Sequence, residues 1–413
     1  MLLLADDLTG ANDAAVQFSK RGFSVVVQVL EGSEDRKMPD CDLLAVNTDS
    51  RPLLPQEAQQ RVKQTLLALG TEQPIYKKID SLLRGNPDSE LEGVLEALGD
   101  ALAIVAPAYP ENQRTMEKGI LRWPGGSTDG LALFRQGMTG RVEPLPLQQV
   151  RQGPDKLVEW LRQARQAGVQ TLVADAVTRE DLASVAQAAE KLPRVVLCGS
   201  AGLAGAVADQ LAARMGLTPK FAPEEETDGA VLTVVGSRNR ETAQQVEELR
   251  QRFGLQPVLL DTDALWENPK RELERCLGEL RRQLGQGSRE LLLAVDSLYK
   301  PFQMVLRDTP EQYEKARQIV EQLGEMARQL CVDERVTGVV ATGGDTALQV
   351  CRAMGTGRLT LEGEVAPGIP AGRMLGGARD GLRMVTKSGG FGQEDALVRA
   401  VEYLRGRGEH NGN

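Results

Sequence analysis

Short apolar runs alternate with amphipathic stretches along the first half of the chain. A helix follows the first run and is expected to end near Arg21 and Gly22, with Gly22 as its C-cap. Further helical stretches include Pro55–Leu69 and Asp155–Ala167. The predicted strands are Leu2–Ala5, Ser24–Leu30, Leu43–Asn47, Ile75–Ile79, Ala103–Ala106, Thr171–Ala174 and Val195–Cys198. Because these runs lack polar alternation and are separated by helices, they predict a mainly parallel sheet with helices on both faces.

The pattern stops at residues 216–229, where the sequence GLTPKFAPEEETDG carries two prolines and an acidic run. Such a stretch is typical of an interdomain linker, and the alternative is a long surface loop. Strand and helix patterns then resume, at Val231–Val235, Arg240–Phe253, Pro257–Leu260, a helix to Leu284, Leu291–Val295, Glu311–Cys331 and Val336–Ala341. We predict two α/β domains, 1–217 and 230–413, joined by a linker at 218–229. Each domain would hold a mainly parallel sheet flanked by helices, and a cleft would lie between the two domains.

Composition and charge exclude several classes of protein. The 413 residues carry a net charge of −9, which argues against a nucleic-acid partner. The single histidine, His410, lies in a polar tail, so neither a His-based catalytic triad nor a His-rich zinc site is expected. Acid–base chemistry would then fall to carboxylates, lysine or the substrate. The absence of a long apolar run, of a signal-peptide pattern and of any CxxC motif predicts a cytoplasmic protein with no membrane partner.

Acidic residues follow the first predicted strand directly. In open α/β sheets, ligands bind at the carboxyl ends of the strands. Asp6 and Asp7 lie at that position, with Asn12 and Asp13 within the next helical turn. The two adjacent carboxylates suit a divalent cation, a hydroxyl proton or a polyol, and the alternative is that one of them caps the helix.

The densest polar cluster, KKIDSLLRGN, follows the strand that begins at Ile75. Its candidate site residues are Lys78, Asp80, Ser81, Arg84 and Asn86. Lysine and arginine suit a carboxylate or a phosphate, and Asp80 is a candidate general base. The alternative is an ordinary charged loop.

Two further arginines each follow a predicted strand, and Arg51 is expected to converge on the same face as the KKIDSLLRGN cluster. Arg51 lies in NTDSR, and Arg114 lies in the proline-containing loop PAYPENQRT, which is alternatively only a rigid connector. Both residues are candidate anion-binding groups. The segment GSAGLAG at 199–205 has GxxGxxG spacing, which is a weak dinucleotide signal, and tight helix–strand packing explains it at least as well.

Three glycine- or serine-containing turns follow predicted strands in the second half. They lie at 236–239, 342–346 and 386–392. Glycines at the start of a helix let backbone amides approach a phosphate, so the turns together favour a nucleotide site. Its candidate residues are Ser237, Gly343, Gly344, Asp345, Thr346, Lys387, Gly389 and Gly390. No GxxxxGK[ST] motif is present, which excludes a Walker-type P-loop.

The ordered set of motifs resembles the four-carbon acid sugar kinase family, formerly a domain of unknown function. The motifs that carry the resemblance are ADDLTGAND, NTDSR, KIDSLLRGN, PAYPENQRT, GSAGLA, VVGSRN, ATGGDT, PGIPAG and TKSGGFG. They span nearly the whole chain. The resemblance implies ATP-dependent phosphorylation of the terminal hydroxyl of threonate, erythronate or 3-oxo-tetronate. It also implies that the N-terminal domain binds the acid and the C-terminal domain binds ATP.

The resemblance implies site residues as well. For the acid they are Asp6 or Asp7, Arg51 and Lys78 to Ser81, with Arg84 and Asn86 nearby; for the nucleotide they are Ser237, Gly343 to Thr346, and Gly389. The sequence departs from the family pattern at Leu82, where threonine is usual, at Gln113, where glycine is usual, and over 119–150. These departures lie on the substrate side, so they leave the identity of the acid open.

We therefore predict a sugar-acid kinase that uses ATP, with Mg²⁺ bridging its phosphates. Lys78 would bind the acid, and Asp80, Asp6 or Asp7 would accept the hydroxyl proton. The alternatives are a sugar-acid sensor without catalysis and, on weaker grounds, a dinucleotide-dependent dehydrogenase. The stereochemistry of the acid, the metal ligands and the oligomeric state stay open, a homodimer included.

Overall fold

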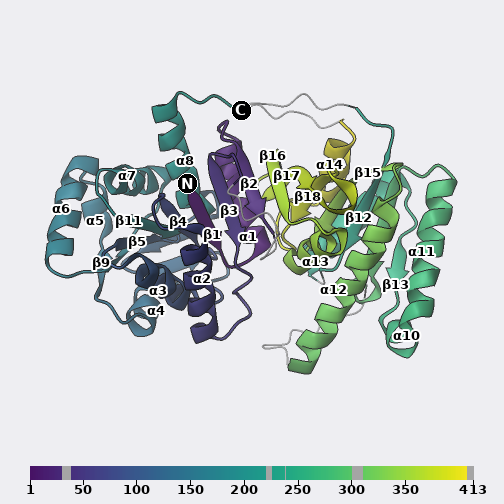
Figure 1. Cartoon of the computed structure of the whole chain (residues 1–413), viewed down its shortest axis with the longest axis horizontal. Coiled ribbons are helices and arrows are strands. Elements are labelled where there is room, and N and C mark those ends of the chain that lie inside the picture. The colour runs from purple at the N-terminus through teal and green to yellow at the C-terminus, as the bar shows by residue number, and fades with distance from the viewer. Residues whose placement is uncertain (30–38, 220–225, 238, 300–309, 407–413) are drawn as a thin grey trace. The chain divides into compact units, whose positions relative to one another are not determined.

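The computed structural model describes residues 1–29, 39–219, 226–237, 239–299 and 310–406 (Figure 1). The chain divides into two units, one formed by Met1–Val27 with Asp35–Lys220 and the other by Gln28–Glu34 with Phe221–Asn413. Residues 220–225 of the expected linker, Arg238 and His410 lie outside the described residues. The boundaries at 217 and 230, and the cleft, stay predictions. Among the described helices, none is long and apolar enough to cross a membrane.

The first unit is built on a sheet with the strand order β2-β3-β1-β4-β11-β5-β10-β9. Its strands are β1 Leu2–Ala5, β2 Val25–Gln28, β3 Leu43–Asn47, β4 Ile75–Lys78, β5 Leu102–Ala106, β9 Val142–Leu145, β10 Thr171–Ala174 and β11 Val195–Gly199. From β3 to β9 each neighbouring pair is parallel. All seven strands predicted in this half are confirmed, with differences of one or two residues at some ends.

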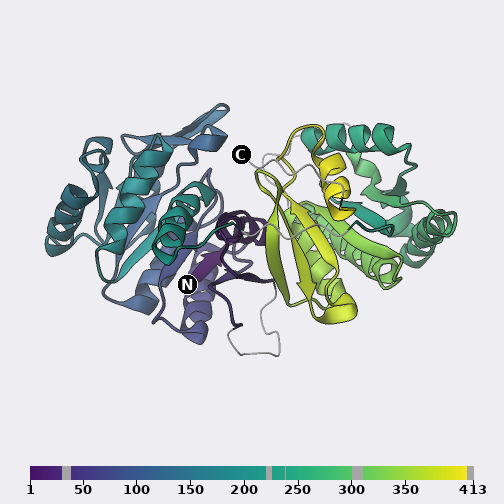
Figure 2. The same cartoon turned by 90° about the horizontal axis from the view of Figure 1, so that it is seen from above.

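Helices cover both faces of this sheet (Figures 1 and 2). One layer packs in the succession α1 (Leu8–Ser19), α8 (Ala201–Met215), α7 (Arg179–Glu190) and α6 (Pro154–Gln166). The other layer contains α2 (Pro55–Leu69), α3 (Pro87–Leu98) and α4 (Gly130–Gly137). The expected C-cap at Gly22 is wrong, because α1 ends at Ser19 and its C-cap is Lys20.

The segment after β5 was not predicted as regular structure. It forms a three-stranded antiparallel sheet of β6 (Thr115–Glu117), β7 (Ile120–Trp123) and β8 (Gly126–Asp129), and the short helix α5 (Leu147–Val150) follows β9. Lys118 and Gly119 have φ values of 53° and 75°, which suits the tight turn between β6 and β7. These strands have only three or four residues each, and β6 and β8 are mostly polar, so their hydrophobic pattern is weak. β9 contains Pro144, which an edge strand tolerates because one side of it needs no ladder hydrogen bonds.

The second unit has the strand order β13-β14-β12-β15-β18-β17-β16. Its strands are β12 Ala230–Val235, β13 Val258–Leu260, β14 Glu290–Val295, β15 Val336–Thr342, β16 Arg358–Ala366, β17 Ile369–Leu375 and β18 Arg383–Lys387. The first five in spatial order are parallel, and β17 runs antiparallel to both β18 and β16. The mainly parallel α/β fold is therefore confirmed, with an antiparallel edge that the sequence did not predict.

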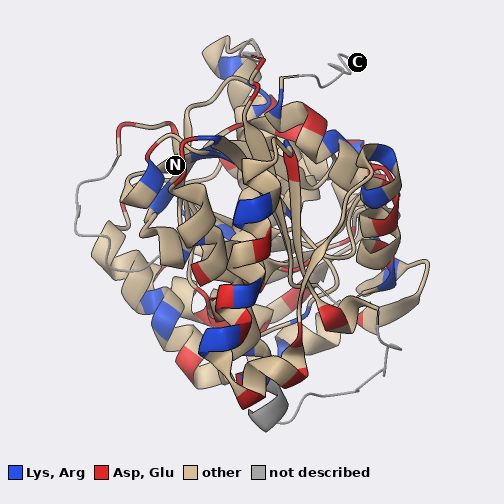
Figure 3. Ribbon diagram, turned by 90° about the vertical axis from the view of Figure 1, so that its right-hand side faces the viewer, with Lys and Arg blue, Asp and Glu red and all other residues tan. Residues whose placement is uncertain are grey.

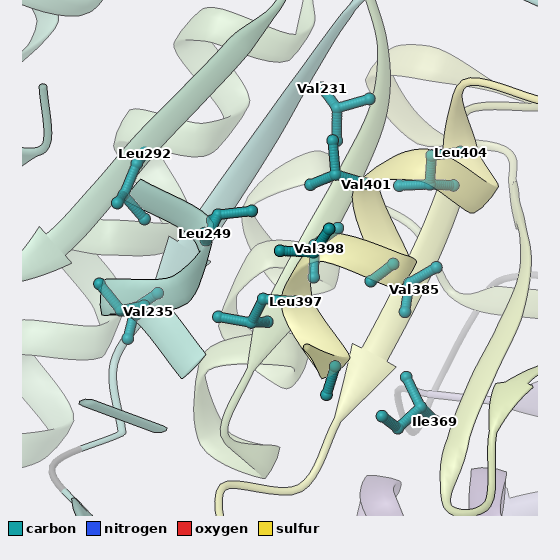
Figure 4. Close-up of a cluster of buried hydrophobic side chains, with 14 of the residues drawn as sticks. Val231, Val235, Leu249, Leu292, Ile369, Val385, Leu397, Val398, Val401 and Leu404 are labelled. Carbon is teal, nitrogen blue, oxygen red and sulfur yellow. The ribbon is translucent and has the colours of Figure 1, made fainter. Parts of the chain in front are cut away.

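Two helix layers cover the sheet of the second unit. One holds α9 (Arg240–Phe253) and α14 (Ala396–Leu404), and the other holds α10 (Thr262–Glu267), α11 (Pro269–Gly285), α12 (Pro310–Cys331) and α13 (Gly344–Met354). Figure 4 shows buried side chains of α9 and α14, among them Leu249 and Leu397, meeting Val231 and Val385 of the sheet. Basic and acidic residues occur together along the helices that face the viewer in Figure 3. The apolar packing fixes the carboxyl ends of β12, β15 and β18 beside one another.

Candidate active site

Charged residues follow three adjacent strands at one edge of the first sheet. β1 pairs in parallel with β3 and with β4, so Ala5 lies beside both Asn47 and Lys78. The residues that come next, among them Asp6 and Arg51, therefore emerge together. The convergence predicted from the sequence is confirmed.

The Arg51 guanidinium lies at the centre of this cluster. Its Nε and Nη2 donate to the two carboxylate oxygens of Asp6, at 2.7 and 3.0 Å, and its Nη1 donates to Asp7 Oδ2 at 2.5 Å. Asp80 Oδ2 lies 3.7 Å from Nη2. The guanidinium thus aligns the two aspartates that follow β1, and the role of Arg51 in binding the acid stays a prediction.

The three carboxylates have different electrostatic environments. Burial opposes ionisation of Asp6, but the charges of Arg51 and Lys77 outweigh it and hold its pKa below the usual value. Burial also opposes ionisation of Asp80, yet hydrogen bonds from Arg84 hold its pKa far below the usual value. Burial and the neighbouring charge of Asp6 raise the pKa of Asp7 despite the attraction of Arg51.

Exposure separates the same three residues. The side chain of Asp7 is 24% exposed, against 9% for Asp80 and 3% for Asp6. A general base must reach its substrate and must gain a proton readily. Asp7 meets both conditions better than Asp80, the candidate general base of the KKIDSLLRGN cluster.

Asp7 also caps the helix that follows it. The backbone N–H of Gly10 donates to Asp7 Oδ1 at 2.6 Å, so the capping alternative is confirmed together with the clustering. A Cβ atom on Gly10 would lie 2.6 Å from this oxygen and 3.2 Å from Lys78 Nζ. The small residue therefore leaves room for the Asp7 carboxylate and the Lys78 ammonium to lie side by side. Lys78 itself is buried and donates to the carbonyl of Ile79 at 3.0 Å.

A second, fully buried group of polar residues supports this edge, and the sequence did not single it out. Lys77 Nζ lies 2.7 Å from Glu90 Oε2, and Ser50 Oγ donates to Glu90 Oε1 at 2.7 Å. Thr48 Oγ1 lies 2.7 Å from Ser50 Oγ and donates to the Ala5 carbonyl at 2.9 Å. The group links the ends of β1, β3 and β4 to α3. In the sequence, this group is indicated only by Glu90, a glutamate on the otherwise apolar face of α3.

The other predicted residues of the first domain have varied partners. Arg84 donates to both oxygens of Asp80, at 3.0 and 2.7 Å. Arg114 Nη1 donates to Ser81 Oγ, which brings the loop after β5 to the loop after β4. The Asn86 amide donates to the carbonyl of Leu53 at 3.0 Å and ties two loops together.

The remaining predictions concern α1 and the loops around it. Asn12 is fully buried, and Asp13 is half-buried in the same helix. Gln113 has a φ of 56°, a left-handed conformation that favours glycine and costs other residues about 1–2 kcal/mol. This conformation is the physical reason for a glycine preference at that position.

The glycine segment 199–205 serves packing. A Cβ atom on Gly202 would lie 2.7 Å from the Ala108 carbonyl oxygen, and one on Gly199 would collide with the Ala106 carbonyl. Ser200 caps α8 and donates to the Ala108 carbonyl at 2.8 Å. The packing interpretation of this segment is confirmed.

Three turns converge at the edge of the second sheet, after the adjacent strands β12, β15 and β18. The Gly343 N–H donates to the Lys387 carbonyl at 2.9 Å. Thr242 Oγ1 donates to the Gly389 carbonyl at 2.9 Å and lies 3.2 Å from Ser237 Oγ. The predicted nucleotide residues of all three turns are therefore neighbours. The turn residues Gly344, Asp345 and Thr346 form the first turn of α13.

Two glycines of these turns cannot take a side chain without strain or a clash. Gly343 has a φ of 104° and precedes α13 directly. A Cβ atom on Gly389 would lie 2.5 Å from Ser237 Oγ and 2.6 Å from Asn239 Nδ2. Backbone amides at such positions can approach a phosphate closely. The geometry therefore fits a nucleotide polyphosphate.

Comparison with known proteins agrees with a sugar site in the first domain and a nucleotide site in the second. Residues 1–207 match the family described as the sugar-binding N-terminal domain, and residues 232–397 match the nucleotide-binding C-terminal domain. The chain thus combines a sugar-binding domain with a nucleotide-binding domain, which is the class of protein that its two sheet edges define.

Its relatives specify the class further. The chain is 32% identical to a D-threonate kinase of Cupriavidus necator, over 98% of this chain and 97% of that protein. It is 30% identical to a D-erythronate kinase of Heliobacterium modesticaldum, with the same coverage. A crystal structure of the Haemophilus influenzae protein HI1011 shares the fold, with a TM-score of 0.70, 22% identity and coverage of 98% and 99%. The chain belongs to the four-carbon acid sugar kinase family.

Proposed function

We propose that this chain transfers the terminal phosphoryl group of ATP to the terminal hydroxyl of a four-carbon sugar acid. The observation that carries the proposal is the cluster of Asp7, Lys78 and Arg51 at one sheet edge. A phosphoryl acceptor needs a carboxylate to take its proton and cations to orient it. The relatives named for D-threonate and D-erythronate support a tetronic acid as the acceptor.

Asp7 accepts the proton of the reacting hydroxyl in this proposal. Arg51 holds the carboxylate through Oδ2 and the Gly10 amide holds it through Oδ1, which leaves a second lone pair on each oxygen. Lys78 lies beside Asp7 and stabilises the oxygen that loses its proton. Asp80 has the different task of fixing Arg84 and the loop after β4.

The second domain would hold ATP through the amides of its glycine turns and the hydroxyls of Ser237 and Thr346. Mg²⁺, when bound, would neutralise charge on the phosphates. Asp345 lies in the first turn of α13 and would offer a carboxylate beside them. No nucleotide contact of the first domain is needed for this assignment.

The direct test is ADP formation by the purified chain with ATP, Mg²⁺ and a panel of D-threonate, D-erythronate and 3-oxo-tetronate. We expect ADP to form only when one of these acids is present. Acid binding without ADP formation would indicate a sensor and would overturn the kinase proposal.

We assign the carboxylate of the acid to Arg114. Its Nη1 donates to Ser81 Oγ, which places the guanidinium beside the loop after β4. Burial lowers the pKa of the guanidinium despite the attraction of Asp80, so an anionic ligand there would stabilise its charge. Arg114→Leu should raise KM for the acid about ten- to hundredfold, the effect of losing a hydrogen bond to a charged group. Steady-state kinetics with the acid and with the matching uncharged polyol provide the measurement.

Arg122→Leu, at an exposed position on the neighbouring strand β7, is the matched control and should leave KM unchanged. The polyol should be a poor substrate for the wild type, and Arg114→Leu should raise its KM only slightly further. Equal losses for acid and polyol would contradict the assignment.

A substitution of Gly343 tests the nucleotide site. A β-branched residue resists a φ of 104°, so Gly343→Val should weaken ATP binding about five- to 150-fold, since such strain is of order 1–3 kcal/mol. Calorimetric titration with ATP gives the affinity, and acid binding should persist. Gly254→Val is the control. It strains a glycine with a φ of 64° at the C-terminal end of α9, whereas the turn after β12 lies at the N-terminal end, so ATP affinity should stay unchanged. Unaltered ATP affinity in folded Gly343→Val would remove this turn from the site.

A further inference from the structure

Lys387 ends β18 as a buried cation that binds its own turn. The residue is 1% exposed. Its ammonium donates to the carbonyls of Ser388 at 2.9 Å, Gly389 at 2.9 Å and Phe391 at 3.2 Å. An ammonium has three hydrogens, so these three bonds use its donors fully.

A second side chain binds the same turn from α9. Gln245 is almost fully buried, and its Nε2 lies within hydrogen-bond distance of the carbonyls of Phe391, Gly392 and Gln393, at 3.0, 3.2 and 3.1 Å. Lys387 and Gln245 together draw the carbonyls of the turn toward the interior of the domain.

The direction of the carbonyls determines the direction of the amides. In a trans peptide the C=O and the following N–H point in opposite directions. Inward carbonyls of Ser388 and Gly389 therefore turn the N–H groups of Gly389 and Gly390 away from the ammonium. Successive amides oriented alike form a concave site for an anion.

The turn lies among the other turns of the nucleotide site. Its Gly389 touches Ser237 and Asn239 of the turn after β12, and the Lys387 carbonyl accepts from Gly343 at the start of α13. The outward amides thus face the region where the three turns meet.

We propose that Lys387 is a positioning residue, which orients the amides of Gly389 and Gly390 toward the phosphates of ATP without contacting the phosphates itself. This inference rests on the proposed use of ATP, and it replaces the expectation that Lys387 is a direct anion contact. The buried charge also makes the potential behind the turn more positive. Burial lowers the pKa of Lys387 to about 8, and Glu241 of α9 opposes that shift.

The test compares Lys387→Met, which keeps the length of the side chain and removes its donors, with Gln245→Leu. Hydrogen exchange of the 386–393 segment is measured in the full chain without nucleotide, and ATP affinity is measured by calorimetry. Both variants should exchange faster in this segment. Lys387→Met should bind ATP about ten- to hundredfold more weakly.

Kinetics separate positioning from a general loss of structure. Lys387→Met should raise KM for ATP while kcat at saturating ATP and KM for the acid stay near the wild-type values. The two substitutions should be less than additive in ATP affinity, because they loosen the same turn. Lys270→Met, at an exposed position on α11, is the control and should change none of these quantities.

Several results would overturn the inference. Unchanged exchange with weakened ATP binding would make Lys387 a direct phosphate ligand, and unchanged ATP affinity would leave it a purely structural residue. A wild-type chain that forms no complex with ATP would refute the proposed function, whatever the exchange of the turn shows. Full additivity with Gln245→Leu would mean that the two side chains act separately.

Discussion

Asp7→Asn is expected to lower kcat about 10²–10⁴-fold, the usual contribution of a positioned general base. Asparagine keeps the shape of the side chain. Its single carbonyl oxygen can replace only one of the two carboxylate oxygens that accept from Gly10 and Arg51. It cannot take a proton from the substrate. ATP affinity should barely change, because the nucleotide residues lie in the other domain.

Asp80→Asn provides the comparison that the structure makes informative. Asp80 accepts hydrogen bonds from the Leu82 amide and from Arg84, and its pKa is held far below the usual value. A carboxylate so stabilised is a weak base. We expect its loss to lower kcat less than tenfold and to raise KM for the acid through a looser loop. A larger fall in kcat for Asp80→Asn than for Asp7→Asn would reverse the assignment.

The pH dependence gives a second measure of the same residue. Burial and the charge of Asp6 raise the pKa of Asp7 above its ordinary value of 3.8. The active form is the carboxylate, so kcat/KM should fall as the pH falls through this raised pKa. This fall in kcat/KM is the acidic limb of the pH profile. Since Asp6 and Asp7 interact, the apparent pKa of the limb belongs to the pair and not to one residue. The limb should be absent from Asp7→Asn and present in Asp80→Asn.

The strands and their shared edge could be predicted from the sequence because each depends on local pattern. Leu2–Ala5, Leu43–Asn47 and Pro55–Leu69 have the bounds expected from hydrophobic runs and helix periodicity. Parallel strands place their carboxyl ends at one edge, so polar residues that follow such strands are expected to meet. The same reasoning predicts both candidate sites from the sequence.

The pairing of charges within the site could not be predicted in this way. The sequence does not say which carboxylate the Arg51 guanidinium binds, since that depends on side-chain rotamers and on the register of neighbouring strands. The raised pKa of Asp7 follows from the same geometry. Lys387 illustrates the point again, because its three acceptors are carbonyls of its own turn.

Breaking the buried ion pair of Lys77 and Glu90 is expected to destabilise the first domain strongly. Removing one member leaves an uncompensated charge in the interior, so Glu90→Leu should lower the free energy of unfolding by about 3–5 kcal/mol. Urea unfolding, followed by the fluorescence of Trp123 and Trp160, measures this change. Glu96→Leu removes an exposed carboxylate of the same helix, paired with Lys63, and should change stability by less than about 1 kcal/mol.

The double variant Lys77→Met with Glu90→Leu separates the net contribution of the pair from the penalty of breaking it. Desolvating two charges offsets much of their attraction, so the double variant should recover most of the stability that Glu90→Leu loses. It should not recover activity in the same measure. Ser50 would lack its carboxylate acceptor, and the end of β3, from which Arg51 reaches Asp6 and Asp7, would be held less firmly. A double variant with full stability and full kcat would show that the pair plays no part in positioning the site.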